Sequence, residues 1–260
     1  MLEARFGKGG EFKKIFEAIR EIVNEGNFDC SHNGIAMQAM DSSHVALVAL
    51  MLRSEAFQPF RCDRPMSLGI SFTTLTKILK CASNDDSITM FSENDKPDRL
   101  GLIFEDTKND KVSEYEVKLI TLDSEHLSIP DQKFQAQVKM SSAEFQKIIR
   151  DLGSLGDTIT VDVDKGSITF KTTGSDGSGT VKLKPPSELD EDALPLEIDL
   201  DAPVSLGFST KYLANVTKAT PLSNMVHLSL MEGSPMLVEY VMEDVGYIRF
   251  YLAPKLDGEE

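Results

Sequence analysis

The sequence predicts an α+β fold of two similar domains, in which antiparallel sheets are covered on one face by helices. A helix-like stretch at residues 11–19 nearly recurs at residues 144–152, and the segment 72–82 resembles the segment 208–219. Short strand-like segments lie between these four stretches. The 260 residues are therefore predicted to form two halves of matching organisation, with enough apolar residues for one or two substantial cores.

Four amphipathic helices are expected, at residues 11–22, 73–82, 142–152 and 209–219. In the first, Phe12, Ile15, Phe16 and Ile19 recur every three or four residues, the spacing of a buried helical stripe. Strands are predicted from alternating or apolar runs that are separated by turn pairs such as Lys165-Gly166. Their ranges are 34–40, 45–52, 68–72, 87–91, 100–104 and 113–119 in the first half, and 158–163, 167–171, 180–184, 196–200, 204–208, 226–230, 236–241 and 247–252 in the second.

Charge is distributed unevenly along the chain. The sequence has 27 Lys and Arg against 42 Asp and Glu, a formal net charge of −15. The four helix windows nevertheless hold nine basic and five acidic residues. A negative average does not exclude a polyanionic partner when basic residues gather on one surface. The helices are the positive part of an acidic protein.

Each helix contains a pair of basic residues three or seven positions apart, such as Lys13/Arg20 and Lys77/Lys80. Both spacings return to nearly the same side of a helix. The simpler alternative is four solvated helix faces. The agreement among four helices in so acidic a chain favours a common basic surface.

Residues 120–134 are predicted to connect the two domains. This segment is acidic and has no period, and Pro130 argues against a helix or a central strand. It keeps Leu127, Ile129 and Phe134, which a purely solvated linker would not need. We expect an extended surface connector between an N-terminal domain at residues 1–119 and a C-terminal domain at residues 135–260.

Composition and motifs argue against secretion, membrane insertion and enzyme chemistry. Three cysteines without C-x-x-C spacing, and no run of 18 apolar residues, predict a soluble protein of a reducing compartment. The glycine-rich segment 174–179 lacks the P-loop lysine, and Asp162–Gly166 departs from EF-hand spacing. The four histidines show no ligand spacing. No catalytic residue, metal or cofactor is therefore predicted, and the chain is interpreted as a binding protein.

Several short segments, taken in their order along the chain, resemble the proliferating cell nuclear antigen family of eukaryotic sliding clamps. The resemblance covers essentially the whole chain. The segments that carry it are Asp41-Ser42-Ser43-His44-Val45, Leu52-Arg53-Ser54-Glu55, Phe60-Arg61-Cys62-Asp63-Arg64, Lys77-Ile78-Leu79-Lys80-Cys81-Ala82, Lys218-Ala219-Thr220-Pro221-Leu222-Ser223 and Tyr251-Leu252-Ala253-Pro254-Lys255.

The resemblance implies two domains, each of two β-α-β-β-β units, and three subunits that close head-to-tail into a ring with the helices lining its hole. The residues that would face the phosphate backbone of encircled duplex DNA are Lys13, Lys14, Arg20, Lys77, Lys80, Lys147, Arg150, Lys211 and Lys218. Such contacts carry no direct sequence information and weaken steeply with salt.

The same resemblance implies a subunit interface in which the strand at 111–118 pairs with residues 177–184 of the next subunit. The residues expected there are Lys111, Tyr115, Lys118, Gly177, Thr180 and Lys182. For Tyr115, an ordinary strand aromatic is the alternative interpretation. Lys165 falls at the family's acceptor position for ubiquitin and SUMO.

A groove under the connector is the second site that the resemblance implies. Partner proteins of the family insert a short helical turn with one aliphatic and two aromatic side chains. The matching positions are Met40, His44, Val45, Leu47, Leu127, Ile129, Pro130, Pro235, Tyr251, Leu252, Ala253 and Pro254. Val45 and Leu47 could equally be plain core residues, and Ser128 and Phe134 replace the family's common glycine and tyrosine.

The expected function is that of a nuclear homotrimeric clamp. It would tether DNA polymerase, dock replication, repair and translesion proteins, and be placed on DNA by a separate ATP-driven loader. Two alternatives stay open at this point: a subunit of a related checkpoint clamp, and an acidic interaction scaffold that never encircles DNA.

Overall fold

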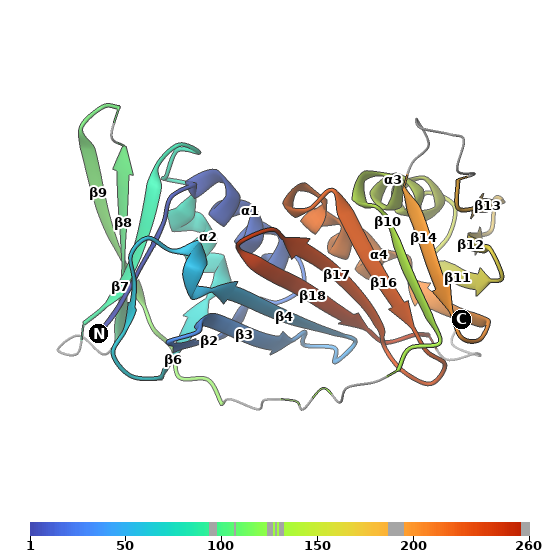
Figure 1. Cartoon of the computed structure of the whole chain (residues 1–260), viewed down its shortest axis with the longest axis horizontal. Helices are drawn as coiled ribbons and strands as arrows, with labels where there is room; N and C mark the ends of the chain where they lie inside the picture. The colour runs from blue at the N-terminus through green and yellow to red at the C-terminus, as the bar shows by residue number, and fades with distance from the viewer. Residues whose placement is uncertain are drawn as a thin grey trace. The chain divides into compact units, whose positions relative to one another are not determined.

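The chain forms two compact units in the computed structural model (Figure 1). The residues described are 1–93, 98–106, 108–123, 127, 129, 133–186 and 195–255. The first unit comprises Met1–Ser42, Val48–Leu127 and Met242–Ile248, and the second comprises Ser43–Leu47, Ser128–Val241 and Arg249–Glu260. Each unit includes one short segment from the other half of the chain, Met242–Ile248 in the first and Ser43–Leu47 in the second. This division does not test the limits 1–119, 120–134 and 135–260, which stay a prediction. No helix in the described part of the chain is long and apolar enough to cross a membrane.

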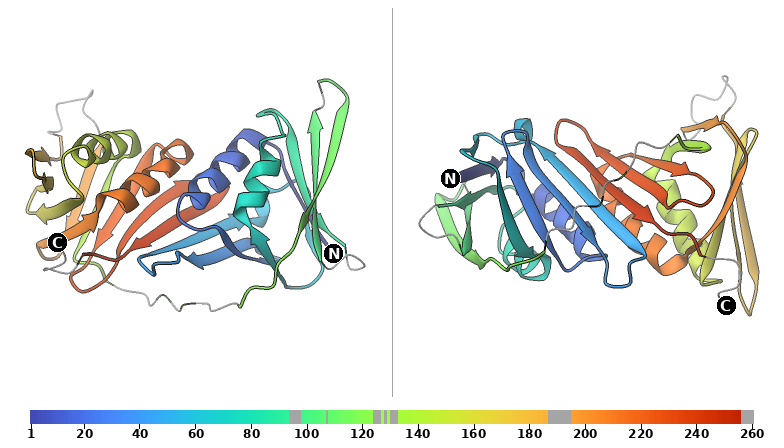
Figure 2. Two further views of the ribbon diagram at one scale, coloured as in Figure 1. Left: turned by 180° about the vertical axis from the view of Figure 1, so that it is seen from behind. Right: turned by 90° about the horizontal axis from the view of Figure 1, so that it is seen from below.

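In the described part of the chain the element order β-α-β-β-β occurs four times, and the elements can be followed by their colours in Figures 1 and 2. The first two repeats are β1 (Leu2–Phe6), α1 (Gly9–Arg20), β2 (Glu25–Ser31), β3 (Gly34–Met40) and β4 (Ala46–Arg53), then β6 (Met66–Ser71), α2 (Phe72–Leu79), β7 (Ser87–Ser92), β8 (Arg99–Asp106) and β9 (Lys111–Lys118). The other two are β10 (Ala136–Ser141), α3 (Ser142–Gly153), β11 (Thr158–Asp164), β12 (Ser167–Thr173) and β13 (Ser178–Leu183), then β15 (Val204–Ser209), α4 (Thr210–Val216), β16 (Met225–Leu230), β17 (Met236–Met242) and β18 (Gly246–Leu252). Short additions are β5 (Phe60–Cys62), β14 (Leu196–Leu200) and the 3-10 segments η1 (Ser54–Ala56) and η2 (Thr217–Leu222). The predicted α+β fold is confirmed.

Within each unit, strands of one repeat pair with strands of the other repeat. β1 pairs with β7 and β2 with β6 in the first unit, while β10 pairs with β16 and β11 with β15 in the second, all antiparallel. The strand orders are β5-β1-β7-β8-β9 and β4-β3-β2-β6 in the first unit, and β13-β12-β11-β15 and β14-β10-β16-β17 in the second. β9 and β13 each lie at the end of a sheet.

The two helices of a unit are held crosswise at their N-termini. In each unit, the N–H of the first residue of one helix donates to a backbone carbonyl in the loop that follows the other helix. The accepting residue is the last one of that loop, directly before the next strand. In the first unit Gly9 donates to Asp86 at 2.9 Å and Phe72 to Asn24 at 2.8 Å. In the second unit the pairs are Ser142 with Asn224 at 2.9 Å and Thr210 with Asp157 at 3.0 Å. Because the first N–H groups of a helix have no partner inside it, these bonds satisfy them and fix each helix pair on its sheets.

Aromatic rings cluster around α1 in the core of the first unit, and the second unit has an aliphatic residue at the centre of the equivalent site. The Phe16 ring lies 4.9 Å from Phe12, 5.6 Å from Phe28 and 6.4 Å from Phe72, measured between ring centroids. The residue 133 positions after Phe16 is Ile149, which is also fully buried. Burial of these apolar surfaces is the main force that holds each helix on its sheets.

The structure corrects several predicted elements. β1, β2, β5 and β10 were not predicted, because polar or charged residues interrupt their apolar residues, as Glu3 and Arg5 do in β1. α4 ends at Val216, and Lys218 lies in the 3-10 segment η2, whose Pro221 cannot donate a helical hydrogen bond. α2 and α4 are equivalent when Ser71 is aligned with Ser209, the residue that immediately precedes each helix. The two similar sequence segments instead align Phe72 with Phe208, which differs from the structural alignment by two residues.

Candidate nucleic-acid interface

All but one of the predicted basic residues are exposed, on the solvent side of the helices or just beyond their C-terminal ends. Amphipathic periodicity buries Phe12, Ile15 and Ile19 of α1 and Phe145, Ile148 and Leu152 of α3, so the opposite face is left to the charged residues. Eight of the nine predicted residues are exposed, which are Lys14, Arg20, Lys77, Lys80, Lys147, Arg150, Lys211 and Lys218. In each unit the two helices pack side by side (Figure 2). Each unit therefore presents its basic residues on one helix pair.

Lys13 differs from the other eight. It is half-buried, and its Nζ donates to the carbonyl oxygen of Ala82, just beyond α2, at 2.8 Å. The residue 133 positions later is Gln146, whose Nε2 donates to the carbonyl oxygen of Thr217, just beyond α4, at 2.9 Å. Both side chains tie one helix of a unit to the end of the other. A neutral amide is sufficient for this role in the second unit.

Acidic neighbours reduce the positive charge of two of the helices. Glu17 of α1 is exposed, and it occupies the position equivalent to Arg150 of α3. The Arg150 guanidinium itself pairs with Asp151 at 3.0 Å. This pair lies on the surface, where ion pairs are weak, so Arg150 can exchange Asp151 for a phosphate at little cost.

The predicted interface residues lie on or beside the two sheet ends. β9 carries Lys111, Tyr115 and Lys118, and β13 carries Thr180 and Lys182, with Gly177 immediately before it. The ring of Tyr115 packs on Phe104 at 5.1 Å between centroids. This contact is what the alternative interpretation, an ordinary strand aromatic, expects, and the interface role of Tyr115 stays a prediction.

Sequence reasoning missed two apolar residues near these ends. Val112 on β9 is 67% exposed and Leu155, which follows α3, is 40% exposed. The Leu155 side chain lies against Gly179 of β13. A Cβ added at Gly179 would lie only 3.0 Å from Cδ1 of Leu155. Neither residue belongs to a periodic stripe that would have marked it. Both sheet ends therefore combine an edge strand with an exposed apolar side chain.

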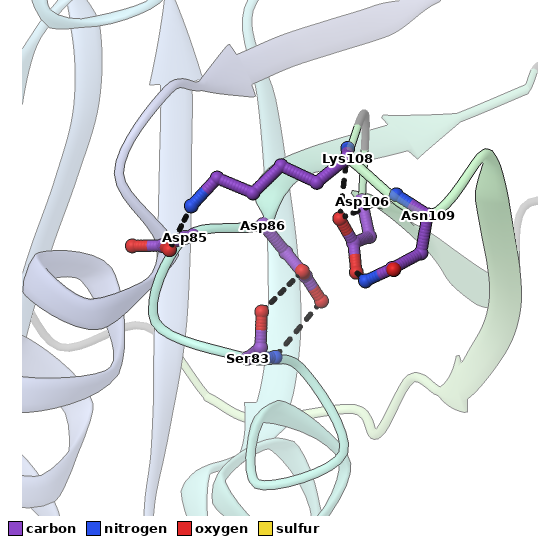
Figure 3. Close-up of polar contacts among 6 residues, drawn as sticks. All are labelled: Ser83, Asp85, Asp86, Asp106, Lys108 and Asn109. Atoms are coloured by element: carbon purple, nitrogen blue, oxygen red, sulfur yellow. Dashed lines mark hydrogen bonds and ion pairs between the residues drawn. The ribbon is translucent and has the colours of Figure 1, made fainter.

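The turn between β8 and β9 is tied to the loop that caps α1 (Figure 3). Lys108 pairs with Asp85 at 2.6 Å, while Asp106 accepts the Lys108 and Asn109 N–H groups at 3.0 and 3.2 Å. The hydrogen bond from the Asn109 side chain is the main reason that the pKa of Asp106 lies below its usual value. Asp86, in the same loop, accepts the Ser83 N–H at 2.8 Å. These contacts hold the turn that leads into β9.

The predicted groove residues differ widely in exposure. Met40 is 37%, Leu127 45% and Ile129 40% exposed, and these are three of the six large apolar side chains that are exposed in the described part of the chain. His44 and Pro235 are exposed as well, whereas Val45, Tyr251, Ala253 and Pro254 are half-buried. Leu47 and Leu252 are buried and belong to the core. Pro130 lies outside the described residues.

Lys165 lies in the turn between β11 and β12 and is exposed. Gly166, which follows it, has a φ of +83°, a conformation that glycine adopts without strain. The turn therefore holds the lysine clear of the sheet. Among the described residues, no group of three or more His, Cys, Asp or Glu side chains is placed to hold a metal ion.

Two similar units, each with exposed basic residues on a helix pair over antiparallel sheets, have the architecture of a DNA sliding clamp. Residues 1–126 match the model of the proliferating cell nuclear antigen N-terminal domain, and residues 128–255 match that of the C-terminal domain. The chain is 45% identical over 260 residues to the proliferating cell nuclear antigen of Chaetomium thermophilum, with all of both chains covered. It is 46% identical over 261 residues to that of Dictyostelium discoideum, with 99% of this chain and all of the relative covered.

The chain belongs to the proliferating cell nuclear antigen family, and the resemblance predicted from the sequence is confirmed. It is a DNA sliding clamp of replication and repair that acts as a processivity factor for DNA polymerase, and it is not an enzyme.

Proposed function

We propose that three copies of this chain close into a ring around duplex DNA, with the helices of every copy facing the hole. The observation that carries the proposal is the segregation of charge. Eight exposed Lys and Arg residues lie on the helices or just beyond their C-terminal ends, in a chain whose net charge is −15. The basic helices attract the phosphate backbone, and the acidic remainder discourages DNA from binding elsewhere on the molecule.

Weak phosphate contacts suit a ring. A closed ring stays on DNA because of its topology, so the helices need only centre the duplex and let it slide. Contacts to phosphates carry no direct sequence information, which fits a clamp that must travel over any sequence. Tight or base-specific binding would oppose that movement.

The two sheet ends supply the subunit interface. A head-to-tail ring requires two different, complementary surfaces on each copy. β9 of one copy would pair with β13 of the next, through Lys111, Tyr115, Lys118, Gly177, Thr180 and Lys182. Unpaired edge strands invite such pairing, and Val112 and Leu155 add apolar surface beside the two edges. The same pairing repeated three times would leave neither edge open.

Partner proteins would dock on the surface of the connector. The exposed side chains of Met40, Leu127 and Ile129 offer apolar contacts, as expected for a short helical turn with one aliphatic and two aromatic anchors. Three anchors at roughly 1.5–3 kcal/mol each, less the cost of ordering, give affinities on the order of micromolar. Such affinities allow polymerases and repair proteins to bind and exchange. Met40 adds an adaptable thioether that tolerates different partners.

Three further features belong to the same proposal. Three copies would need a separate ATP-driven loader to open around closed DNA, and the ring would work in the nucleus. Lys165, exposed in its turn, would accept ubiquitin or SUMO. The domain limits 1–119 and 135–260, with a connector at 120–134, complete the proposed organisation.

Light scattering across a dilution series at moderate salt tests the ring. A mass of about 86 kDa, three times the 28.7 kDa chain, that persists to low concentration is the expected result. A stable monomer or dimer would contradict a homotrimer and favour a heteromeric checkpoint-type clamp or a scaffold. Reversing Lys14, Lys80, Lys147 and Lys218 to Glu should then abolish processive synthesis on a primed circular template, whereas a scaffold would keep its function.

A further inference from the structure

One side-chain amide holds the middle of the connector. Gln38 on β3 donates from Nε2 to the carbonyl oxygen of Leu127 at 3.1 Å, and the Leu127 N–H donates to its Oε1 at 2.7 Å. The two bonds run in opposite directions between one amide and one residue's backbone. A residue of a neighbouring antiparallel strand would make the same two bonds, one to the carbonyl and one from the N–H of Leu127.

The position of Gln38 on its strand explains what this contact does. Ile35 and Met37 of β3 are buried, while Gln38 and Met40 lie on the opposite face, since successive side chains of a strand alternate. Leu127 of the connector therefore lies at the outer face of β3, beside Gln38. The contact occupies the polar groups of Leu127 and leaves its apolar side chain 45% exposed.

Other hydrogen bonds hold the ends of the connector. At its start, the Ile120 N–H donates to the Gly69 carbonyl at 2.9 Å, and a Cβ at Gly69 would lie 2.0 Å from the Ile120 oxygen. At its end, the Gln135 N–H donates to Leu230 at 3.0 Å. Leu127 lies near the midpoint between these two residues. A long segment fixed only at its ends samples many conformations, and a contact at the midpoint reduces them.

We propose that Gln38 is a positioning residue for partner docking: it fixes the connector so that Leu127 is presented to the partner over the same face of β3 as Met40. The inference rests on the proposed docking function of this surface. A partner's apparent affinity falls in proportion to the fraction of molecules whose connector is correctly placed. Only a side chain with a donor and an acceptor in one plane can make both bonds, which Gln provides and Glu or Ala does not.

The test compares Gln38→Ala and Gln38→Glu with Gln137→Ala, a control at an exposed strand position of β10. The probe is a labelled synthetic peptide with one aliphatic and two aromatic anchors in one helical turn, titrated by fluorescence anisotropy. Gln38→Ala should raise its Kd by roughly 3- to 30-fold. Gln38→Glu, which keeps the acceptor for the Leu127 N–H, should fall between Gln38→Ala and the wild type, and Gln137→Ala should match the wild type.

Two further measurements separate positioning from general damage. Hydrogen exchange should become faster in residues 120–134 of Gln38→Ala, while the mass by light scattering and the melting temperature stay at the wild-type values. Wild-type affinity and exchange in Gln38→Ala, or an equal loss in Gln137→Ala, would overturn the role of Gln38 alone. A wild-type protein that fails to bind the peptide would instead overturn the proposed docking function.

Discussion

The helix pairs of the two units share one backbone plan and differ in their side chains. Each helix begins with the same crosswise bond, from Gly9, Phe72, Ser142 and Thr210. Lys14 and Lys147 are equivalent and exposed, as are Lys80 and Lys218 once the repeats are registered on Ser71 and Ser209. Lys13 is instead matched by Gln146, and both tie the two helices of their unit together. The comparison therefore separates two classes of basic residue. Lys14 and Lys80, with their equivalents, face solvent in both units, whereas the amine of Lys13 is bonded to the Ala82 carbonyl.

The largest contrast between the units is in their cores. Phe16→Ala should lower the free energy of unfolding by about 3–5 kcal/mol, because the cavity it leaves removes the packing against three other rings. Ile149→Ala, at the equivalent position, removes fewer atoms and should cost about 2–4 kcal/mol. Urea unfolding at one fixed protein concentration measures both. A larger loss for Ile149→Ala would show that the aromatic cluster is not the tighter core.

The next contrast is between the two sheet ends, β9 and β13. Val112→Glu and Leu155→Glu would each place an unpaired carboxylate in the proposed interface, at a cost of about 3 kcal/mol. Such a cost raises the dissociation constant of assembly about 100-fold. Val241→Glu, at a β17 position that is 41% exposed, is the matched control. Light scattering against dilution should show dissociation of the first two variants, and an intact trimer of either would remove that residue from the interface.

Periodicity predicted those parts of the fold that local sequence determines. The spacing of Phe12, Ile15 and Ile19 defines a helix with a buried face, and the same spacing predicts where Lys14 and Arg20 point. Strand β1 was not predicted, because the charged residues Glu3 and Arg5 leave its five positions without an apolar run. Such strands depend on partners far along the chain, as Leu2 pairs with Ser92.

The candidate sites show the same limit. Leu47 and Leu252 match a groove by resemblance but are buried, and no local pattern distinguishes a surface leucine from a core one. The contact of Gln38 joins residues 89 positions apart, so nothing near Gln38 in the sequence predicts it. Val112 and Leu155 are single apolar residues whose place becomes visible once the sheet order is known.

Basic residues of the two classes should respond differently to salt. Lys14→Gln and Lys147→Gln should lower the slope of log affinity for duplex DNA against log salt concentration by about 0.9 for every phosphate that the variant no longer neutralises. Lys13→Gln should leave the slope unchanged, because a glutamine already performs the equivalent task at position 146. Anisotropy titrations of one duplex at several salt concentrations provide the slopes. An equal decrease for Lys13→Gln would show that its amine leaves Ala82 to reach the DNA.

The smallest effect concerns the turn that leads into β9, and it depends on pH. Hydrogen bonds, that of the Asn109 side chain above all, hold the pKa of Asp106 in the folded chain below its ordinary value. A carboxyl whose pKa is depressed by folding stabilises the folded state above its unfolded pKa, and that contribution is lost as the pH falls through the folded pKa. Asp106→Asn should therefore speed hydrogen exchange in the turn at neutral pH, relative to the wild type. The difference should shrink as the pH is lowered from neutrality to below the ordinary Asp pKa of about 3.9. A difference that stays constant with pH would mean that the turn depends on the shape of the side chain and not on its charge.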